Sequence, residues 1–228
     1  MVCVTVAVVV ALVAAAAPSY AQAAASQPVR RIAVDVGVGL LGGAPLGSAD
    51  ANLRANEQSR QAYRLFTTSS DIARAPLWHV RTALALTRRL ALEGALTKGS
   101  PDIRTLATSD AEAAPPVTVT ERVDQYFIDG SLLFMLEELR IGARLVPFVA
   151  AGAGYLRQLH EGRTVIEQGQ VYHTGGGIKY WLLTRNAGMV RATGVRGDAR
   201  VYLTRGGISL EEGLRSHLAI SGSVFVGF

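Results

Sequence analysis

Eight charged residues recur on one side of a series of alternating apolar stretches. In each stretch every second residue is mostly apolar, and the charged residues take positions in between. They are four acids and four bases: Asp35, Arg81, Glu93, Asp129, Lys179, Arg196, Asp198 and Arg200. Charges removed from water are tolerated only when they are paired. The chemistry that these residues predict is ion pairing in an enclosed interior.

Residues that could carry catalysis are few and form no known motif. No two of the four histidines have the spacing of metal ligands. They are His79, His160, His173 and His217. The glycine-rich segments 152–154 and 175–177 neither open a helix nor carry the Lys-Ser/Thr pair of a phosphate-binding loop. We expect no catalytic residue, no metal site and no cofactor.

The elements that must position the charges are strands, because an alternation of period two predicts a strand with one apolar face. Eight such runs follow one another: 31–41, 77–87, 90–97, 119–135, 143–156, 170–182, 192–203 and 217–228. A length of roughly ten residues suits a tilted strand that crosses a bilayer. The final run would be an aggregation-prone edge unless it were paired, and pairing with the first run closes a barrel.

The connections between these runs differ in length. Those after the second, fourth and sixth runs are short. Those after the first, third, fifth and seventh are mostly longer: 42–76, 98–118, 157–169 and 204–216. Outer-membrane barrels have short turns on one side and long loops on the other. Within the longest loop, segment 49–65 is rich in Ala, Glu, Gln and Arg, which predicts a short helix or disorder, and partial order at best.

The beginning of the chain predicts a leader. An uncharged apolar run of about sixteen residues, Val2 to Ala17, is short for a spanning helix. Small residues at Ser19 and Ala21 suit signal peptidase. We expect a signal peptide over 1–21, a periplasmic linker over 22–30 and an outer-membrane β-barrel over 31–228. An uncleaved helical anchor is the alternative, since no Lys or Arg precedes the apolar run.

The interior of the expected barrel is small. Eight strands enclose only enough space for side chains to fill. Balanced charge predicts a closed, ion-paired lumen, and glycines on the same face make room for the long side chains. These glycines are Gly37, Gly39, Gly152, Gly154, Gly175 and Gly177. A narrow pore lined by the same charges is the alternative.

The net charge of +5 bears on the partners. The basic residues are scattered and follow no helix face, so we expect no nucleic acid. Exposed Arg residues suit the phosphates of lipopolysaccharide, and plain solubility is the simpler explanation for them. The expected partners are outer-membrane lipid and lipopolysaccharide, around a monomer.

Three segments, 147–155, 175–180 and 224–228, resemble the eight-stranded outer membrane protein β-barrel family, which includes OmpA-type transmembrane barrels and small surface-antigen barrels. The resemblance implies an all-β, antiparallel, up-and-down transmembrane barrel in the outer membrane of a Gram-negative cell, reached by Sec-type export. It also implies insertion by the barrel assembly machinery, which would recognise the final strand. The residues of this signal are Ile220, Val224, Val226 and Phe228.

The chain is therefore predicted to be a non-enzymatic outer-membrane barrel with a structural or surface-interaction role through its long loops. A lipid A-modifying enzyme is an alternative, although the His-x-Ser pair of the deacylase type is missing after His173 and His217. For a palmitoyltransferase-like site, His160 and Ser216 are the loop-side candidates. A porin-like pore and a soluble lipocalin-like carrier, with its apolar face inside, are further alternatives.

Overall fold

The computed structural model describes residues 32–54, 62–109, 112, 115–142, 144–160, 166–185, 188–208 and 213–228. The expected signal peptide and linker, over 1–21 and 22–30, lie outside these residues. Within the described ranges, no helix is both long enough and apolar enough to cross a membrane.

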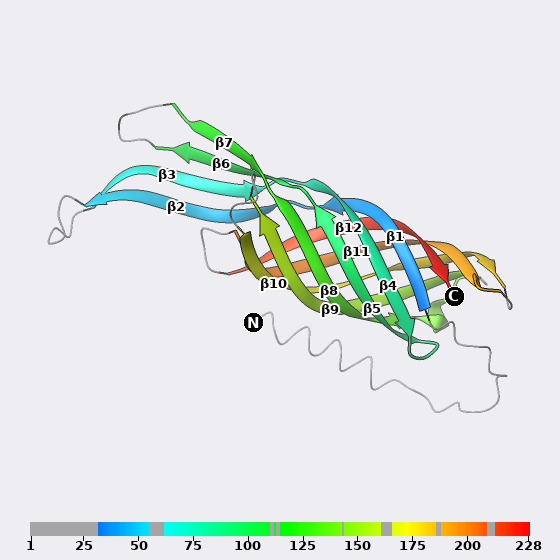
Figure 1. The fold of residues 1–228 in the computed structure, drawn as a ribbon. Coiled ribbons are helices and arrows are strands. Elements are labelled where there is room, and N and C mark those ends of the chain that lie inside the picture. The colour runs from blue at the N-terminus through cyan, green and yellow to red at the C-terminus, as the bar shows by residue number, and fades with distance from the viewer. Residues whose placement is uncertain are drawn as a thin grey trace.

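Eight antiparallel strands close into a barrel (Figure 1). They are β1 (Ile32–Leu41), β4 (Ala75–Ala85), β5 (Leu90–Gly99), β8 (Asp124–Met135), β9 (Leu145–Leu159), β10 (Ile166–Thr184), β11 (Ala192–Gly206) and β12 (Leu214–Gly227). Each pairs with its neighbours in chain order, and β1 pairs with both β4 and β12. The barrel therefore has no free edge, and the predicted eight-stranded all-β fold is confirmed.

The two faces of each barrel strand follow the alternation in the sequence. On β1, Val36, Val38 and Leu40 are exposed on the outside, whereas Asp35 and Gly37 are buried inside. The other barrel strands repeat this pattern, with Val, Leu and Ile outward. An apolar exterior around a charged interior is the reverse of what a soluble lipocalin-like carrier needs.

A second sheet stands where the sequence predicted a short helix or disorder. Four strands form it in the order β2-β3-β6-β7. They are β2 (Ala44–Arg54), β3 (Ala62–Ile72), β6 (Asp102–Thr108) and β7 (Val117–Arg122). The described parts of 49–65 are strand, so the helix prediction is wrong there. Their Ala-rich composition favours a helix only weakly, and pairing with the Phe66-Thr67-Thr68 stretch of β3 overrides it. The run predicted over 119–135 is likewise two strands, β7 and β8.

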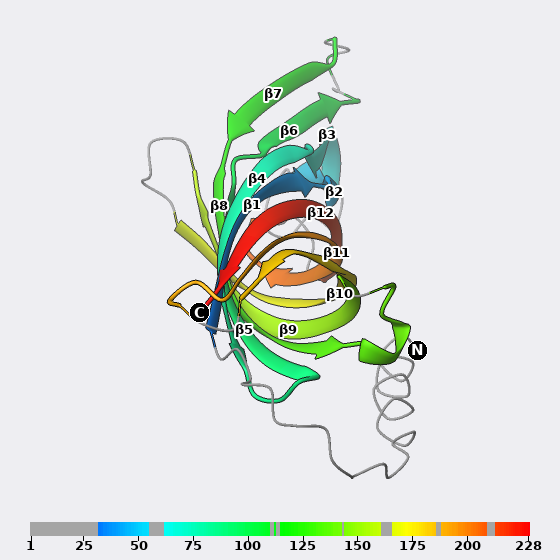
Figure 2. The same ribbon diagram turned by 90° about the vertical axis from the view of Figure 1, so that its right-hand side faces the viewer.

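The second sheet projects beyond the barrel end that lies opposite the carboxyl terminus (Figure 1; Figure 2 shows it from the side). Its base is held by packing and by backbone hydrogen bonds. Leu46, Ile72, Ile103 and Val123 form a buried cluster at the junction, with Ile208 packed against it. The amide of residue 73 donates to the carbonyl of residue 102, and that of residue 123 to the carbonyl of residue 101. We call this unit, β2, β3, β6 and β7, the protruding sheet.

The opposite end of the barrel holds the start of β1 and the end of β12. The connections at this terminus end are the β4–β5 turn, the β8–β9 connection with its single-turn 3-10 helix η1 (Glu137–Leu139), and the β10–β11 connection. In the first of these, the Thr87 hydroxyl accepts hydrogen bonds from the amides of Arg89 and Leu90 at 3.2 and 3.0 Å. A hydroxyl that caps its own turn explains why two arginines can follow in so tight a connection.

Candidate functional site

A network of ion pairs crosses the barrel interior, and Arg196 of β11 is at its centre. Its guanidinium donates to Glu93 of β5, to Asp35 of β1 at 3.0 Å and to Asp198 at 2.8 Å. All four side chains are at most 7 % exposed. Asp198 is on β11 itself, whereas β5 lies opposite β11 in the order of strands around the barrel, so the pair of Arg196 and Glu93 joins opposite walls.

Two further arginines complete the network. Arg200 donates to Glu93 at 2.6 Å and to Asp198 at 3.3 Å. Arg81 of β4 donates to Asp198 at 2.8 Å and to Ser221 at 3.3 Å. The interior network, as we call it, thus balances three acids against three bases. Its members are Asp35, Arg81, Glu93, Arg196, Asp198 and Arg200.

The other two charged residues of the predicted set have different partners. Asp129 accepts a hydrogen bond from Nε2 of His173 at 2.9 Å. The His173 ring lies against Tyr202, with centroids 5.1 Å apart. Lys179 is 7 % exposed, and its ammonium lies 5.8 Å from the Phe148 ring centroid. Among the described residues, neither Asp129 nor Lys179 forms a salt bridge with a member of the interior network, although Glu93 and Asp35 attract Lys179 at longer range.

The inward glycines stand directly across from large interior side chains. Gly175 pairs with Arg200, and Gly177 pairs with Asp198. Gly37 likewise pairs with His79 of β4. A Cβ on Gly177 would lie 2.2 Å from the carbonyl oxygen of Gly197 and 2.7 Å from Cβ of Asp198. Because these glycines have no side chain, the side chains of Arg200, Asp198 and His79 have room to lie across the glycine of the neighbouring strand.

Apolar layers lie in the interior on both sides of the charges. The layer toward the protruding sheet contains Leu41, Leu77, Phe127, Leu156, Val171, Tyr202 and Ala219. The layer toward the terminus end contains Ala91, Leu133, Phe148 and Ala150, with Met135 packed against it. Sequence reasoning missed these layers. The run 119–135 already contained a sign of them. Phe127 and Leu133 are apolar residues at alternate positions that are otherwise polar, and these positions face the interior.

The predicted barrel-assembly residues lie on the outside of the last strand. Ile220 and Val224 are 58 and 59 % exposed, and Phe228 is 39 % exposed. The amide of Phe228 donates to the carbonyl of Ile32 at 2.9 Å, which ties the end of the chain to β1. Val226 pairs with Val34 of β1. Recognition of these residues by the assembly machinery stays a prediction.

The histidines form no catalytic arrangement among the described residues. His160 lies 2.7 Å from Glu121 of β7, while Ser216 lies on β12, which β10 and β11 separate from β9. His173 and Asp129 have side chains that are 0 % exposed. Within the described ranges, no three His, Asp or Glu side chains gather as they would around a metal ion.

No protein-family model and no curated protein matches this sequence. Solved structures do. Neisserial surface protein A is 11 % identical, with a TM-score of 0.51, over 86 % of this chain and 99 % of that one. The outer membrane protein OprG of Pseudomonas aeruginosa is 9 % identical, with a TM-score of 0.44, over 86 and 93 %. Ail, the attachment invasion locus protein of Yersinia pestis, is 8 % identical, with a TM-score of 0.37, over 87 and 99 %. At this identity the likeness concerns fold alone, and it confirms the predicted resemblance of fold: the chain has the closed eight-stranded barrel fold of the outer-membrane proteins.

Proposed function

We propose that the protein is an outer-membrane barrel that presents a protruding sheet at the cell surface for contact with other proteins. The apolar exterior suits a hydrocarbon surround, and a closed barrel leaves no backbone group of its wall unpaired there. Short connections lie at the terminus end, the arrangement of outer-membrane barrels with their turns in the periplasm. The protruding sheet would then face outward from the cell.

The observation that carries this proposal is the pair of unpaired edges on the protruding sheet. Within the described residues, β2 pairs only with β3, and β7 pairs only with β6. Edges of this kind accept an extended segment of another chain as an added strand. Residues 117–120 of β7 alternate Val and Thr, and Val117 and Val119 are 56 and 62 % exposed. The partner we propose is a protein that adds a strand to β7.

The name of the Neisserial protein, a surface protein, also supports a surface role. The location is tested by membrane fractionation and by comparing boiled and unboiled samples on a detergent gel. We expect the protein in the outer-membrane fraction, with a band that shifts on boiling. Recovery in a soluble fraction without detergent would contradict the proposal.

A photo-crosslinking residue at Val119 tests the contact in intact cells. We expect discrete protein adducts, because an added strand would lie beside this side chain. The same residue at Leu132, which is 49 % exposed on the barrel exterior, should give lipid adducts alone. A Val117→Lys change should reduce the Val119 adducts several-fold without altering the boiling shift, since charged side chains discourage strand addition. Absence of protein adducts at Val119 would overturn strand addition.

The closed interior predicts a result in planar bilayers. The interior network and its two apolar layers would leave little of the cross-section free for ions. We expect no steady large conductance from the purified protein. Stable single-channel steps would favour the pore alternative. Lipid A with a changed acyl pattern in expressing cells, measured by mass spectrometry, would favour the enzyme alternative.

A further inference from the structure

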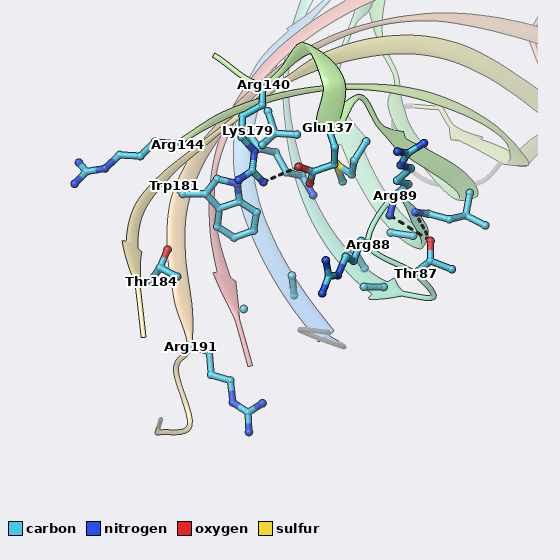
Figure 3. A pocket seen from close by; sticks show the side chains of 18 of the residues that line it. Thr87, Arg88, Arg89, Glu137, Arg140, Arg144, Lys179, Trp181, Thr184 and Arg191 are labelled. Carbon is cyan, nitrogen blue, oxygen red and sulfur yellow. Dashed lines mark hydrogen bonds and ion pairs between the residues drawn. The ribbon is translucent and has the colours of Figure 1, made fainter. Parts of the chain in front are cut away.

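The terminus end of the barrel is hollowed into a basin of about 920 Å³ (Figure 3). Each of the three short connections contributes two arginines to its lining. They are Arg88 and Arg89, Arg140 and Arg144, and Arg185 and Arg191. We call this feature the basic basin. Because the three connections are separated in sequence by whole strands, closure of the barrel is what brings the six arginines to the lining of one cavity.

Acids in these connections are too few to neutralise the arginines. Across 86–89, 136–144 and 185–191 there are six Arg and two Glu. Glu137 pairs with Arg140 at 2.7 Å, and Glu138 pairs with Arg89 at 2.8 Å. For Arg144, Arg185 and Arg191, no acidic partner lies among the described residues. A concave surface with one sign of excess charge concentrates ions of the opposite sign.

Lys179 gives a second, independent indication at the inner wall of the basin. It lines the cavity and is 7 % exposed. Within the described ranges Glu93 and Asp35 attract it at longer range, but neither forms a salt bridge or a hydrogen bond with it. Its ammonium lies 5.8 Å from the ring centroids of both Phe148 and Phe225. Ring faces offer a buried cation much less than an anion would. The cavity is the side from which an anion can reach it.

Trp181 lies on the same wall and faces the opening (Figure 3). Its indole packs edge-on against Phe225, with centroids 4.8 Å apart. Ala33, Ala83 and Leu90 also line the basin. The lining therefore combines an apolar wall with a basic rim, which suits a ligand that has an anionic group and an organic part.

We infer that the basic basin binds a phosphate-bearing anion. Guanidinium groups match the oxygens of phosphate in pairs, and arginines from three connections that line one cavity can contact several phosphate groups together. Lys179 would reach the deepest phosphate oxygen, and the Trp181 ring would cover the organic part. The same chemistry is offered by two sources at this end of a membrane barrel: the head groups of anionic phospholipids, and soluble compounds with several phosphates.

Trp181 makes the binding measurable. The chain has two tryptophans, and Trp78 lies outside the basin on the exterior of β4. A Trp78→Phe background leaves Trp181 as the reporter. With this barrel in phosphatidylcholine nanodiscs, one arm adds tripolyphosphate, and the other replaces part of the lipid with phosphatidylglycerol. We expect a saturable change of Trp181 fluorescence in at least one arm. A response to tripolyphosphate identifies a soluble source, and a response to phosphatidylglycerol alone identifies lipid.

Matched triple variants separate a site from general charge. Arg144→Gln with Arg185→Gln and Arg191→Gln should weaken the response at least about tenfold, because each change removes a charge-assisted contact. The control is Arg64→Gln with Arg104→Gln and Arg205→Gln, exposed residues outside the basin. It removes the same charge and should leave the affinity unchanged.

If the first triple variant lacks the boiling shift, Arg191→Gln alone replaces it, with a several-fold loss expected. No fluorescence change in either arm, or equal weakening by both triple variants, would overturn the proposal. Neither outcome bears on strand addition at β7.

Discussion

Glu93→Gln is expected to lower the free energy of unfolding by about 3–5 kcal/mol, because it leaves buried arginines without their main counter-charge. Glu93 is 0 % exposed and accepts hydrogen bonds from both Arg196 and Arg200. Glutamine keeps the shape of the side chain and removes the charge. The interior network would then hold two acids against three bases inside an apolar wall, where an excess charge is poorly solvated.

Urea unfolding of the protein in lipid vesicles, followed by tryptophan fluorescence, measures this change. The control is Glu138→Gln, which makes the same substitution in an exposed ion pair with Arg89, where the side chain of Glu138 is 66 % exposed. An exposed pair is worth about 0–1 kcal/mol, so the control should unfold almost as the wild type does.

A second change tests whether charge balance is the cause. Adding Arg200→Met to Glu93→Gln restores equal numbers of acids and bases, so part of the lost stability should return. The residual pairs would be those of Arg196 with Asp35 and Asp198, and of Arg81 with Asp198. If the double variant were less stable than Glu93→Gln by the full cost of losing Arg200, the network would not act through its net charge.

Much of the barrel could be predicted because a period of two is a strong constraint. Leu218, Ile220 and Val224 share one parity, and a slip of one residue would turn all three inward. Closure followed from the need to pair the last run. The protruding sheet could not be found in this way. The strands β2, β3 and β6 have no buried face over most of their length, so no sustained apolar alternation marks them, and part of β7 was merged with β8 in the predicted run 119–135. Composition alone pointed to a short helix or disorder over 49–65.

The interior shows the same limit at the level of single residues. Parity places Asp129 and Lys179 inside, and both are buried. Which partner each one meets depends on its height in the barrel and on which strands face it. The register of the strands sets both the height and the facing strands. The sequence therefore does not show that Asp129 meets His173, or that Lys179 lies near aromatic rings. The basic basin was missed for a related reason: its six arginines are scattered along the chain and meet only after closure.

Gly177→Val is the second change for which we expect a large effect, because the added Cβ has no space. At 2.2 Å from the carbonyl oxygen of Gly197, it would overlap with backbone that the strand ladder holds in place. Flexible side chains can move away from such contacts, whereas a paired strand cannot without losing its hydrogen bonds. We expect a loss of about 3 kcal/mol or more and a sample that shows no boiling shift.

Gly197→Val is the matched control, since Gly197 lies on the exterior of β11 and an added Cβ would meet nothing within 4 Å. This variant also replaces Gly by Val, but on β11, the strand that pairs with the strand of Gly177. We expect its stability to stay within about 0.5 kcal/mol of the wild type. Equal tolerance of both variants would mean that the inward glycines are not needed for the close approach of β10 and β11. The position of Asp198, where it accepts hydrogen bonds from Arg81 and Arg196, would then need another explanation.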